Sequence, residues 1–198
     1  MKYLITFLML SLLVTANASD KLKMNYKNKD ILEVIENYSK ETNQKFIIDP
    51  NVKGKITIFI PGEISYEEAF ENLSSALASN GYGILKQGET MLVRSARKIQ
   101  RDSLEVSTKL PTIKPERMFT WIYQVENLNS NDIINRLRIL SSQDGEIAQV
   151  ESTNQLIITD WTSSLSRIAT ILKIVDVKVD SSKTKVTENQ NRKDHIKK

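Results

Sequence analysis

The chain has 198 residues, a formal net charge of +4 and no cysteine, so disulfides, thiolate nucleophiles and cysteine-ligated metal sites are excluded. The positive charge is concentrated in residues 181–198, which contain six basic and two acidic residues. Because Lys2 carries one further charge, residues 19–180 sum to +4 − 4 − 1 = −1, and a nearly neutral body does not indicate a nucleic-acid-binding surface.

Residues 1–18 have the pattern of a secretory signal peptide. An apolar run from Leu4 to Val14 precedes Ala16-Asn17-Ala18, a small-x-small cleavage site. The run is shorter than the about 20 residues that span a bilayer, so a cleaved signal peptide is favoured over an uncleaved anchor. The mature chain is expected to be exported and periplasmic.

Residues 19–95 predict a compact α+β domain with the order β-α-β-β-α-β-β. Leu22, Met24 and Tyr26 alternate with polar residues, which indicates a half-buried first strand. The clearest helix starts at Ser65, which forms a capping-box pattern with Glu68.

The stretch "DPNVKGKITI" lies between two β-forming runs, "KFII" and "ITIFI". Pro50 fixes φ, Asn51 tolerates the left-handed region and Gly54 is free to take a positive φ. The pattern predicts a hairpin that joins the two flanking strands.

Residues 96–117 contain charges of both signs and two prolines without sustained periodicity, which predicts a linker. Residues 118–178 then predict a second, smaller domain with the order β-α-β-β-α, whose hairpin turns at residues 152–154. Residues 179–198 are polar and basic and are expected to be a disordered tail.

Two blocks of the sequence resemble the bacterial secretins, the outer-membrane channel subunits of type II secretion and type IV pilus machines. Residues 24–58 and 65–94, with the Asp-Pro-x-Val-x-Gly motif from Asp49, resemble the first periplasmic secretin domain, which is also similar to the signalling domain of TonB-dependent receptors. Residues 119–176, with a Thr-Asn-x-Leu-Ile-Ile-Thr-Asp run ending at Asp160, resemble the KH-like ring-building domain that follows it.

The resemblance implies two small α/β sandwich-type domains, one of the secretin/TonB short N-terminal type and one KH-like. It further implies non-catalytic docking onto an inner-membrane component and other secretin subunits, with a homo-oligomeric ring as the assembly and an outer-membrane secretin complex as its site. The further repeats and pore domain of secretins are not present in this sequence. Two alternatives remain open: a signalling module of the TonB-receptor type and a truncated, non-functional secretin.

No catalytic, cofactor or metal motif is found, and an enzyme is not expected. The only histidine, His195, lies in the polar tail. RNA binding is not expected either, because the loop "SSQDGEI" lacks the Gly-x-x-Gly clamp of KH domains. Trp121 and Trp161 are expected to pack in a core or on a domain surface rather than to form a partner hot spot.

The first strand is the candidate site for a protein partner. Its residues Leu22, Met24 and Tyr26 precede the first helix and have no hairpin neighbour in sequence, while the lysines between them are typical of an exposed edge strand. The alternative is an ordinary paired strand with solvated lysines.

Overall fold

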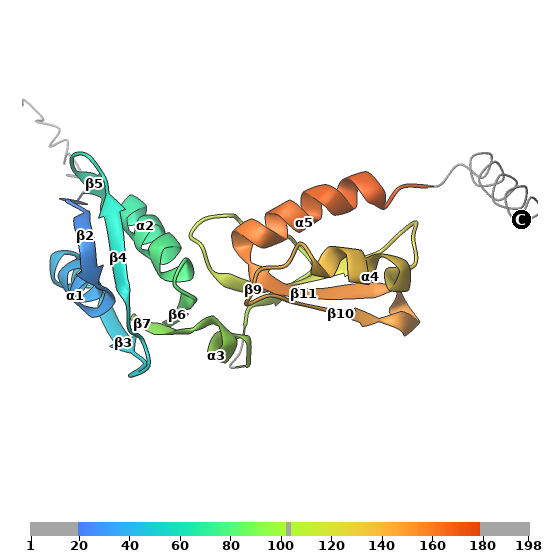
Figure 1. Cartoon of the computed structure of the whole chain (residues 1–198), viewed down its shortest axis with the longest axis horizontal. Helices are drawn as coiled ribbons and strands as arrows, with labels where there is room; N and C mark the ends of the chain where they lie inside the picture. The colour runs from blue at the N-terminus through green and yellow to red at the C-terminus, as the bar shows by residue number, and fades with distance from the viewer. Residues whose placement is uncertain (1–19, 102–103, 179–198) are drawn as a thin grey trace, which may run out of the picture.

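The computed structural model describes residues 20–101 and 104–178; the predicted signal peptide and the predicted tail lie outside these residues. It has a mixed α+β fold, as expected, and two separate hydrophobic cores that lie side by side in an elongated molecule (Figure 1). We call residues 20–95 the first lobe and residues 106–178 the second lobe.

The first lobe contains three small sheets and two helices. One sheet pairs β2 with β4, a second has the order β3-β7-β6, and β1 pairs with β5. The elements in chain order are β1 Lys21–Leu22, β2 Asn25–Asp30, α1 Ile31–Thr42, β3 Lys45–Ile48, β4 Lys55–Phe59, β5 Ile64–Ser65, α2 Tyr66–Ala78, β6 Tyr82–Gln87 and β7 Thr90–Ser95.

Both helices of this lobe begin at side-chain caps. The Asp30 carboxylate accepts a hydrogen bond from the backbone N–H of Leu32, and the Ser65 hydroxyl accepts one from that of Glu68, as the capping-box pattern predicts. Each cap therefore fixes the residue at which the helix begins after a strand. The apolar side of each helix packs into the core.

The hairpin predicted around "DPNVKGKITI" is wrong. β3 pairs in parallel with β7, whereas β4 pairs antiparallel with β2, so the two flanking strands belong to different sheets. The loop 49–54 crosses between these sheets: the N–H of Asp49 bonds the carbonyl of Val93, Val52 is buried in the core, and the carbonyl of Gly54 (φ 128°) accepts from Ile31. Alternating apolar residues indicate a strand with one buried face. The pattern is the same whether the two strands pair with each other or join different sheets, so it does not distinguish the two arrangements.

The second lobe contains one sheet with the strand order β10-β11-β9-β8 and two helices. Helices α4 and α5 cover the same face of this sheet (Figure 1), where both supply residues to the second core. The elements in chain order are β8 Val106–Ser107, β9 Met118–Gln124, α4 Ser130–Arg138, β10 Glu146–Val150, the 3-10 turn η1 Glu151–Thr153, β11 Gln155–Trp161 and α5 Thr162–Val175.

The predicted second hairpin is confirmed, since β10 pairs antiparallel with β11. Asn154 closes it in the left-handed region with φ 54°. Its amide nitrogen donates to the carbonyls of Val125 and Leu128, and its amide oxygen accepts from the N–H of Ser130. The asparagine of the motif therefore ties the hairpin to the start of α4.

Asp176 fastens the end of α5 to the same region. Its carboxylate accepts hydrogen bonds from the hydroxyl of Tyr123 at 2.8 Å and from the backbone N–H groups of Glu126, Asn127 and Leu128. Burial is the largest single influence on this carboxyl and raises its pKa, but the donated hydrogen bonds together hold the pKa below its usual value.

The segment 96–117, expected to be a linker, contains regular structure. It begins with helix α3, Ala96–Arg101, and includes β8, which pairs in parallel with β9. Farther along, the Lys114 ammonium lies 3.0 Å from the Glu71 carboxylate of α2. The segment therefore contacts both lobes.

Candidate functional site

The structure buries two of the three residues of the predicted partner-binding strand. The expected strand is split: β1 pairs with β5 and β2 with β4. Leu22 is 5% exposed and Met24 fully buried, both in the first core, and Tyr26 packs partly against that core. Their side chains therefore support the strand from beneath, and the groups that can meet a partner lie on its other face.

The outer face of the β2–β4 pair presents an exposed aromatic ring. Along β4, Ile56 and Ile58 point into the core, whereas Lys55, Thr57 and Phe59 alternate with them and face outward. Phe59 is 65% exposed, an unusual position for so large an apolar side chain. An isolated exposed aromatic residue on a sheet is suited to serve as an anchor in a protein interface.

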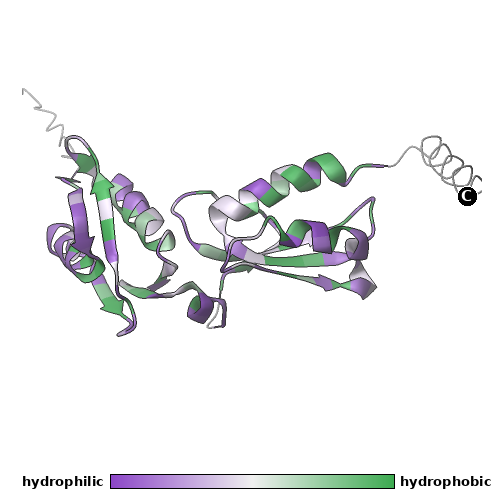
Figure 2. Cartoon of the chain, viewed as in Figure 1, coloured by the Kyte–Doolittle hydropathy of each residue, from purple (hydrophilic) through white to green (hydrophobic). Residues whose placement is uncertain are grey.

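Two outward residues of β2 complete this surface. Asn25 lies opposite Phe59 in the antiparallel register, and Lys27 is exposed two residues further on. We call the set Asn25, Lys27, Lys55, Thr57 and Phe59 the docking face. Figure 1 shows β2 and β4 in the part of the first lobe that is remote from the second, and Figure 2 shows that β2 is hydrophilic along most of its length.

The docking face is basic. Lys27 and Lys55 make no ion pair with any residue in the described part of the chain. The neighbouring Lys29 is paired, with its ammonium 2.7 Å from the Glu33 carboxylate, and Lys23 lies 3.9 Å from Glu63. The unpaired charges beside Phe59 therefore favour an acidic surface as the complement.

A bulge shapes the middle of the same strand. The register shifts between Tyr26 and Lys29, and Asn28 takes a left-handed φ of 52°. Its backbone N–H donates to the Thr57 hydroxyl at 2.9 Å rather than to a β4 carbonyl. Asn28 tolerates this conformation, and the bulge gives the exposed strand an irregular edge of the kind that limits uncontrolled strand pairing.

A groove of about 460 Å³ opens beside β1 and the start of β2. Tyr26 and Asn37 lie within it, and burial raises the pKa of the Tyr26 hydroxyl. The groove is rimmed by charges of both signs: Lys21, Lys23, Lys40, Glu41 and Glu63. Such a mixed polar lining offers hydrogen bonds to a protein segment and contains no nucleophile paired with a base.

The described residues include no group of three or more histidine, aspartate or glutamate side chains placed to hold a metal ion. In residues 20–101 and 104–178, no helix has the length and apolar character needed to cross a membrane.

The second lobe has a different candidate surface on the face of its sheet opposite α4 and α5. There Ala148, Ile157 and Ile122 lie directly opposite one another on β10, β11 and β9, and form one apolar row across three strands. Ala148 is exposed and both isoleucines are half-buried. We call this the open face.

The partner site predicted at Leu22, Met24 and Tyr26 stays a prediction; the structure adds that the first two side chains are buried and that the outward side chains of the neighbouring strand include Phe59. Sequence analysis did not single out Phe59 as an exposed residue. The available signal was its position in "KITIFI", out of phase with the three isoleucines.

Comparison with known proteins finds similarity to the secretins. Residues 24–93 match the family model of the GspD-like N0 domain. The chain is 28% identical over 155 residues to the secretin XcpQ of Pseudomonas aeruginosa, which covers 78% of this chain and 23% of that protein. It is 25% identical over 175 residues to the secretin PulD of Klebsiella pneumoniae, covering 87% of this chain and 26% of that protein.

Among solved structures, the outer-membrane complex of the Klebsiella pneumoniae type II secretion system, which contains PulD, PulS and the PulC HR domain, matches with a TM-score of 0.68 at 24% identity. The match covers 78% of this chain and 26% of that chain. The present chain thus spans about a quarter of the length of these relatives. The chain is therefore similar to the N-terminal domains of the type II secretins, and its first lobe matches the GspD-like N0 domain.

Proposed function

We propose that the chain is a non-catalytic, periplasmic docking module of a type II secretion complex. In this proposal the first lobe binds an inner-membrane component through its docking face, and the second lobe packs beside other copies. The observation that carries it is the solvent-exposed Phe59 on the same outer face as the unpaired Lys27 and Lys55, since protein interfaces combine an apolar anchor with charged residues at its side.

The domain division follows the same proposal. Residues 19–95 form a domain of the secretin/TonB short N-terminal type, and residues 118–178 a KH-like ring-building domain, with residues 96–117 between them. The two separate cores and the N0 match over residues 24–93 support this division. Residues 1–18 act as the signal peptide that delivers the chain to the periplasm.

The partner of the first lobe is a protein of the PulC type. The related complex from Klebsiella pneumoniae contains the PulC HR domain together with PulD, which supports this choice. Leu22, Met24 and Tyr26 belong to the same site: the first two hold the strand in place from the core, and Tyr26 lines the groove at its edge. No strand pairs with β2 on the side away from β4 among the described residues, so a partner strand can add there.

The second lobe offers its open face to a neighbouring copy. Three apolar residues in register across adjacent strands form a continuous surface without charge, which suits packing against a matching apolar surface. A ring of copies, associated with an outer-membrane secretin complex, is the assembly that this packing builds.

The comparisons favour type II secretion over a pilus machine, because the matching family model is GspD-like. A signalling role of the TonB-receptor type is not favoured, because the curated relatives that match over both lobes are secretins.

Site-specific photocrosslinking tests the proposal in cells. A photoreactive phenylalanine analogue at position 59 should give an adduct with a PulC-type protein, and the same analogue at Ala148 should give an adduct between two copies of this chain. Ile47, which is 59% exposed on β3, is the matched control and should give neither. Absence of adducts at both positions would support the truncated, non-functional alternative, and a copy-to-copy adduct at position 59 would overturn the assignment of the docking face.

A further inference from the structure

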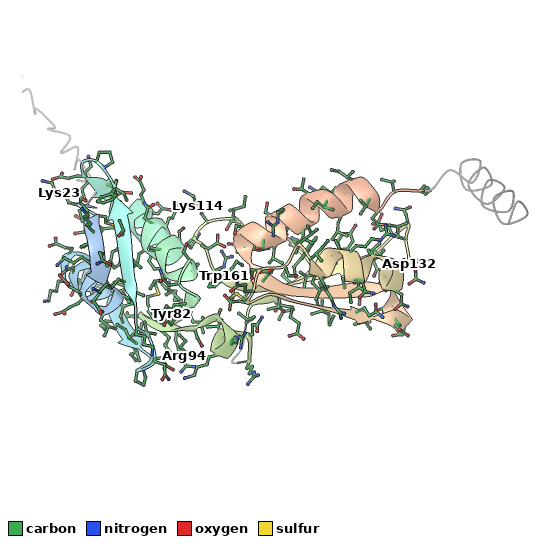
Figure 3. The ribbon with its side chains drawn as sticks, in the orientation of Figure 1. Lys23, Tyr82, Arg94, Lys114, Asp132 and Trp161 are labelled. Atoms are coloured by element: carbon green, nitrogen blue, oxygen red, sulfur yellow. The ribbon has the colours of Figure 1, made fainter. Side chains whose placement is uncertain are left out.

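Helix α3 lies between the two lobes, and its apolar side packs in a cluster with residues of both (Figure 1). It directly follows β7, and its two apolar residues, Ala96 and Ile99, are 0% and 1% exposed. Trp161, at the end of β11, lies at the junction of the lobes (Figure 3). Together with Met118, these residues form a third hydrophobic cluster, separate from both lobe cores, against which Ala78, Leu85 and Leu104 also pack.

Gly83 makes the contact at the centre of this cluster. A Cβ atom at Gly83 would lie 2.6 Å from Cδ1 of Ile99 and 3.5 Å from two ring carbons of Trp161. The φ angle of Gly83 is outside the left-handed region, so its backbone conformation is open to any residue. A Cβ here would require the terminal methyl group of Ile99 to move and would meet Trp161 at ordinary van der Waals distance. The glycine therefore lets α3 and Trp161 approach β6 closely, and a larger side chain would intrude between them.

Polar contacts hold α3 from the first lobe. The Lys98 ammonium lies 2.5 Å from the Asp49 carboxylate, in the loop 49–54. The same carboxylate accepts from the backbone N–H of Asn51 at 3.0 Å, which fixes its position in the turn. The hydrogen bond from Lys98 is the largest of the influences that lower the pKa of Asp49 to about 2, so the pair is charged at neutral pH.

Polar contacts also hold α3 from the second lobe. The side-chain amide of Gln100 donates to the backbone carbonyl of Asp144. The loop that carries Asp144 is itself fixed by the fully buried Asp160, whose carboxylate accepts from the backbone N–H of Ser142 at 2.8 Å and from its hydroxyl at 2.5 Å. A Cβ at Gly145 would lie 2.3 Å from Asp160, so this loop is packed directly on the carboxylate.

We propose that α3 is a clamp that joins the two lobes into one rigid body and sets the angle between the docking face and the open face. Asp49 and Asp160, which come from the two motifs that mark the two domains, hold the two sides of this clamp. Lys114 and Glu71 add a third connection on the side of α2. Domains joined by a linker without a packed interface are expected to move relative to each other, and the buried cluster around Ile99 is what distinguishes this chain from that case.

A distance measurement between the lobes tests the clamp directly. The chain has no cysteine, so spin labels on Glu67→Cys in α2 and Arg136→Cys in α4 report one distance without background labelling. Both positions are exposed and lie outside the three clusters. The otherwise unchanged chain should give a single narrow distance distribution by pulsed electron paramagnetic resonance.

Gly83→Val should broaden this distribution and shift its mean, because the added methyl groups displace Ile99 and Trp161. Lys86→Val, on the exposed part of the same strand, is the matched control and should leave the distribution unchanged. Lys98→Ala combined with Gln100→Ala removes both polar contacts from the helix surface and decides the question if Gly83→Val does not fold. A broad distribution in the parent chain, or a parent-like narrow one in both folded variants, would refute the clamp.

Discussion

The two lobes expose apolar surface in opposite ways. In the first lobe the apolar group on the docking face is a single ring, Phe59, set among lysines that have no ion-pair partner among the described residues. In the second lobe the apolar groups are a row of smaller side chains, Ala148, Ile157 and Ile122, in register across three strands without a charge among them.

The difference indicates what kind of surface each lobe meets. An anchor with a charged rim selects a partner by charge complementarity. A second copy that presented the same basic docking face would be repelled. An uncharged row has no such restriction and can pack against an identical chain. One polypeptide thus separates binding to a different protein from binding to itself by placing the two surfaces on different lobes.

The largest expected effect is on stability, and it tests whether the two lobes unfold as independent units. Leu73 is fully buried in the first core, so Leu73→Ala should lower the free energy of unfolding by about 2–5 kcal/mol. Both tryptophans, Trp121 and Trp161, lie in or at the second lobe. If the lobes are joined by the clamp, the tryptophan fluorescence transition in urea should shift with this distant change.

The matched substitution is Leu156→Ala, at a fully buried position of the second core. It should shift the same transition by a comparable amount. A tryptophan transition that responds to Leu156→Ala but not to Leu73→Ala would show that the lobes unfold separately.

The next largest effect should be on binding by the first lobe alone. Phe59→Ala removes the exposed anchor and should weaken affinity for a PulC-type partner by about 2 kcal/mol or more, roughly 30-fold, as interface hot spots do. Stability should change by no more than about 0.5 kcal/mol, because the side chain is exposed. Isothermal titration calorimetry checks the affinity, with Ile47→Ala as the control that should bind normally.

A smaller effect is expected on the stability of the second lobe. Asp176 has a folded-state pKa below its unfolded value, so its contribution to stability is fully present above the unfolded pKa and is lost as the pH falls through the folded pKa. Asp176→Asn should reduce stability at neutral pH by about 1–3 kcal/mol, since an amide accepts fewer of the four hydrogen bonds.

The variant should also show less loss of stability than the parent chain between neutral pH and the acid range below about pH 4, where the unfolded carboxyl titrates. Urea unfolding at a series of pH values measures this difference. Equal pH dependence in both chains would contradict the assignment of that stabilisation to Asp176.

The smallest effect concerns the charges of the docking face. Replacing Lys27 and Lys55 by glutamine should slow association with an acidic partner and reduce its dependence on salt, with a change in equilibrium affinity of about 1 kcal/mol or less. Stopped-flow association at several ionic strengths measures both quantities. The two substitutions should not change the self-association of the chain when it is measured in the same way. A change in self-association would show that the docking face and the open face take part in one interface.

Much of the local structure could be predicted from the sequence, because caps, turns and alternation are local signals. The start of α2 at Ser65 and the hairpin that ends at Asn154 are examples. Strand pairing was harder: "KFII" and "ITIFI" each have one buried face, and nothing in either run states which sheet it joins.

The candidate site at Leu22, Met24 and Tyr26 stays a prediction; the alternation of these residues with polar ones indicated a half-buried strand, and the structure buries Leu22 and Met24. The clamp could not be predicted at all. The α3 sequence, "ARKIQR", is short and half of its residues are charged, and its significance depends on Gly83 and Trp161, which are distant in sequence.

The crossing of the loop 49–54 between the two sheets has a mechanical consequence. β4, which carries Phe59, is the next element after this loop, and Asp49 at the loop's other end holds Lys98 of α3. A pull exerted by a bound partner on β4 therefore passes along the covalent chain to the ion pair and then into the second lobe. Because Val52 of the loop and Ile56 and Ile58 of β4 belong to the first core, that core bears part of the same load.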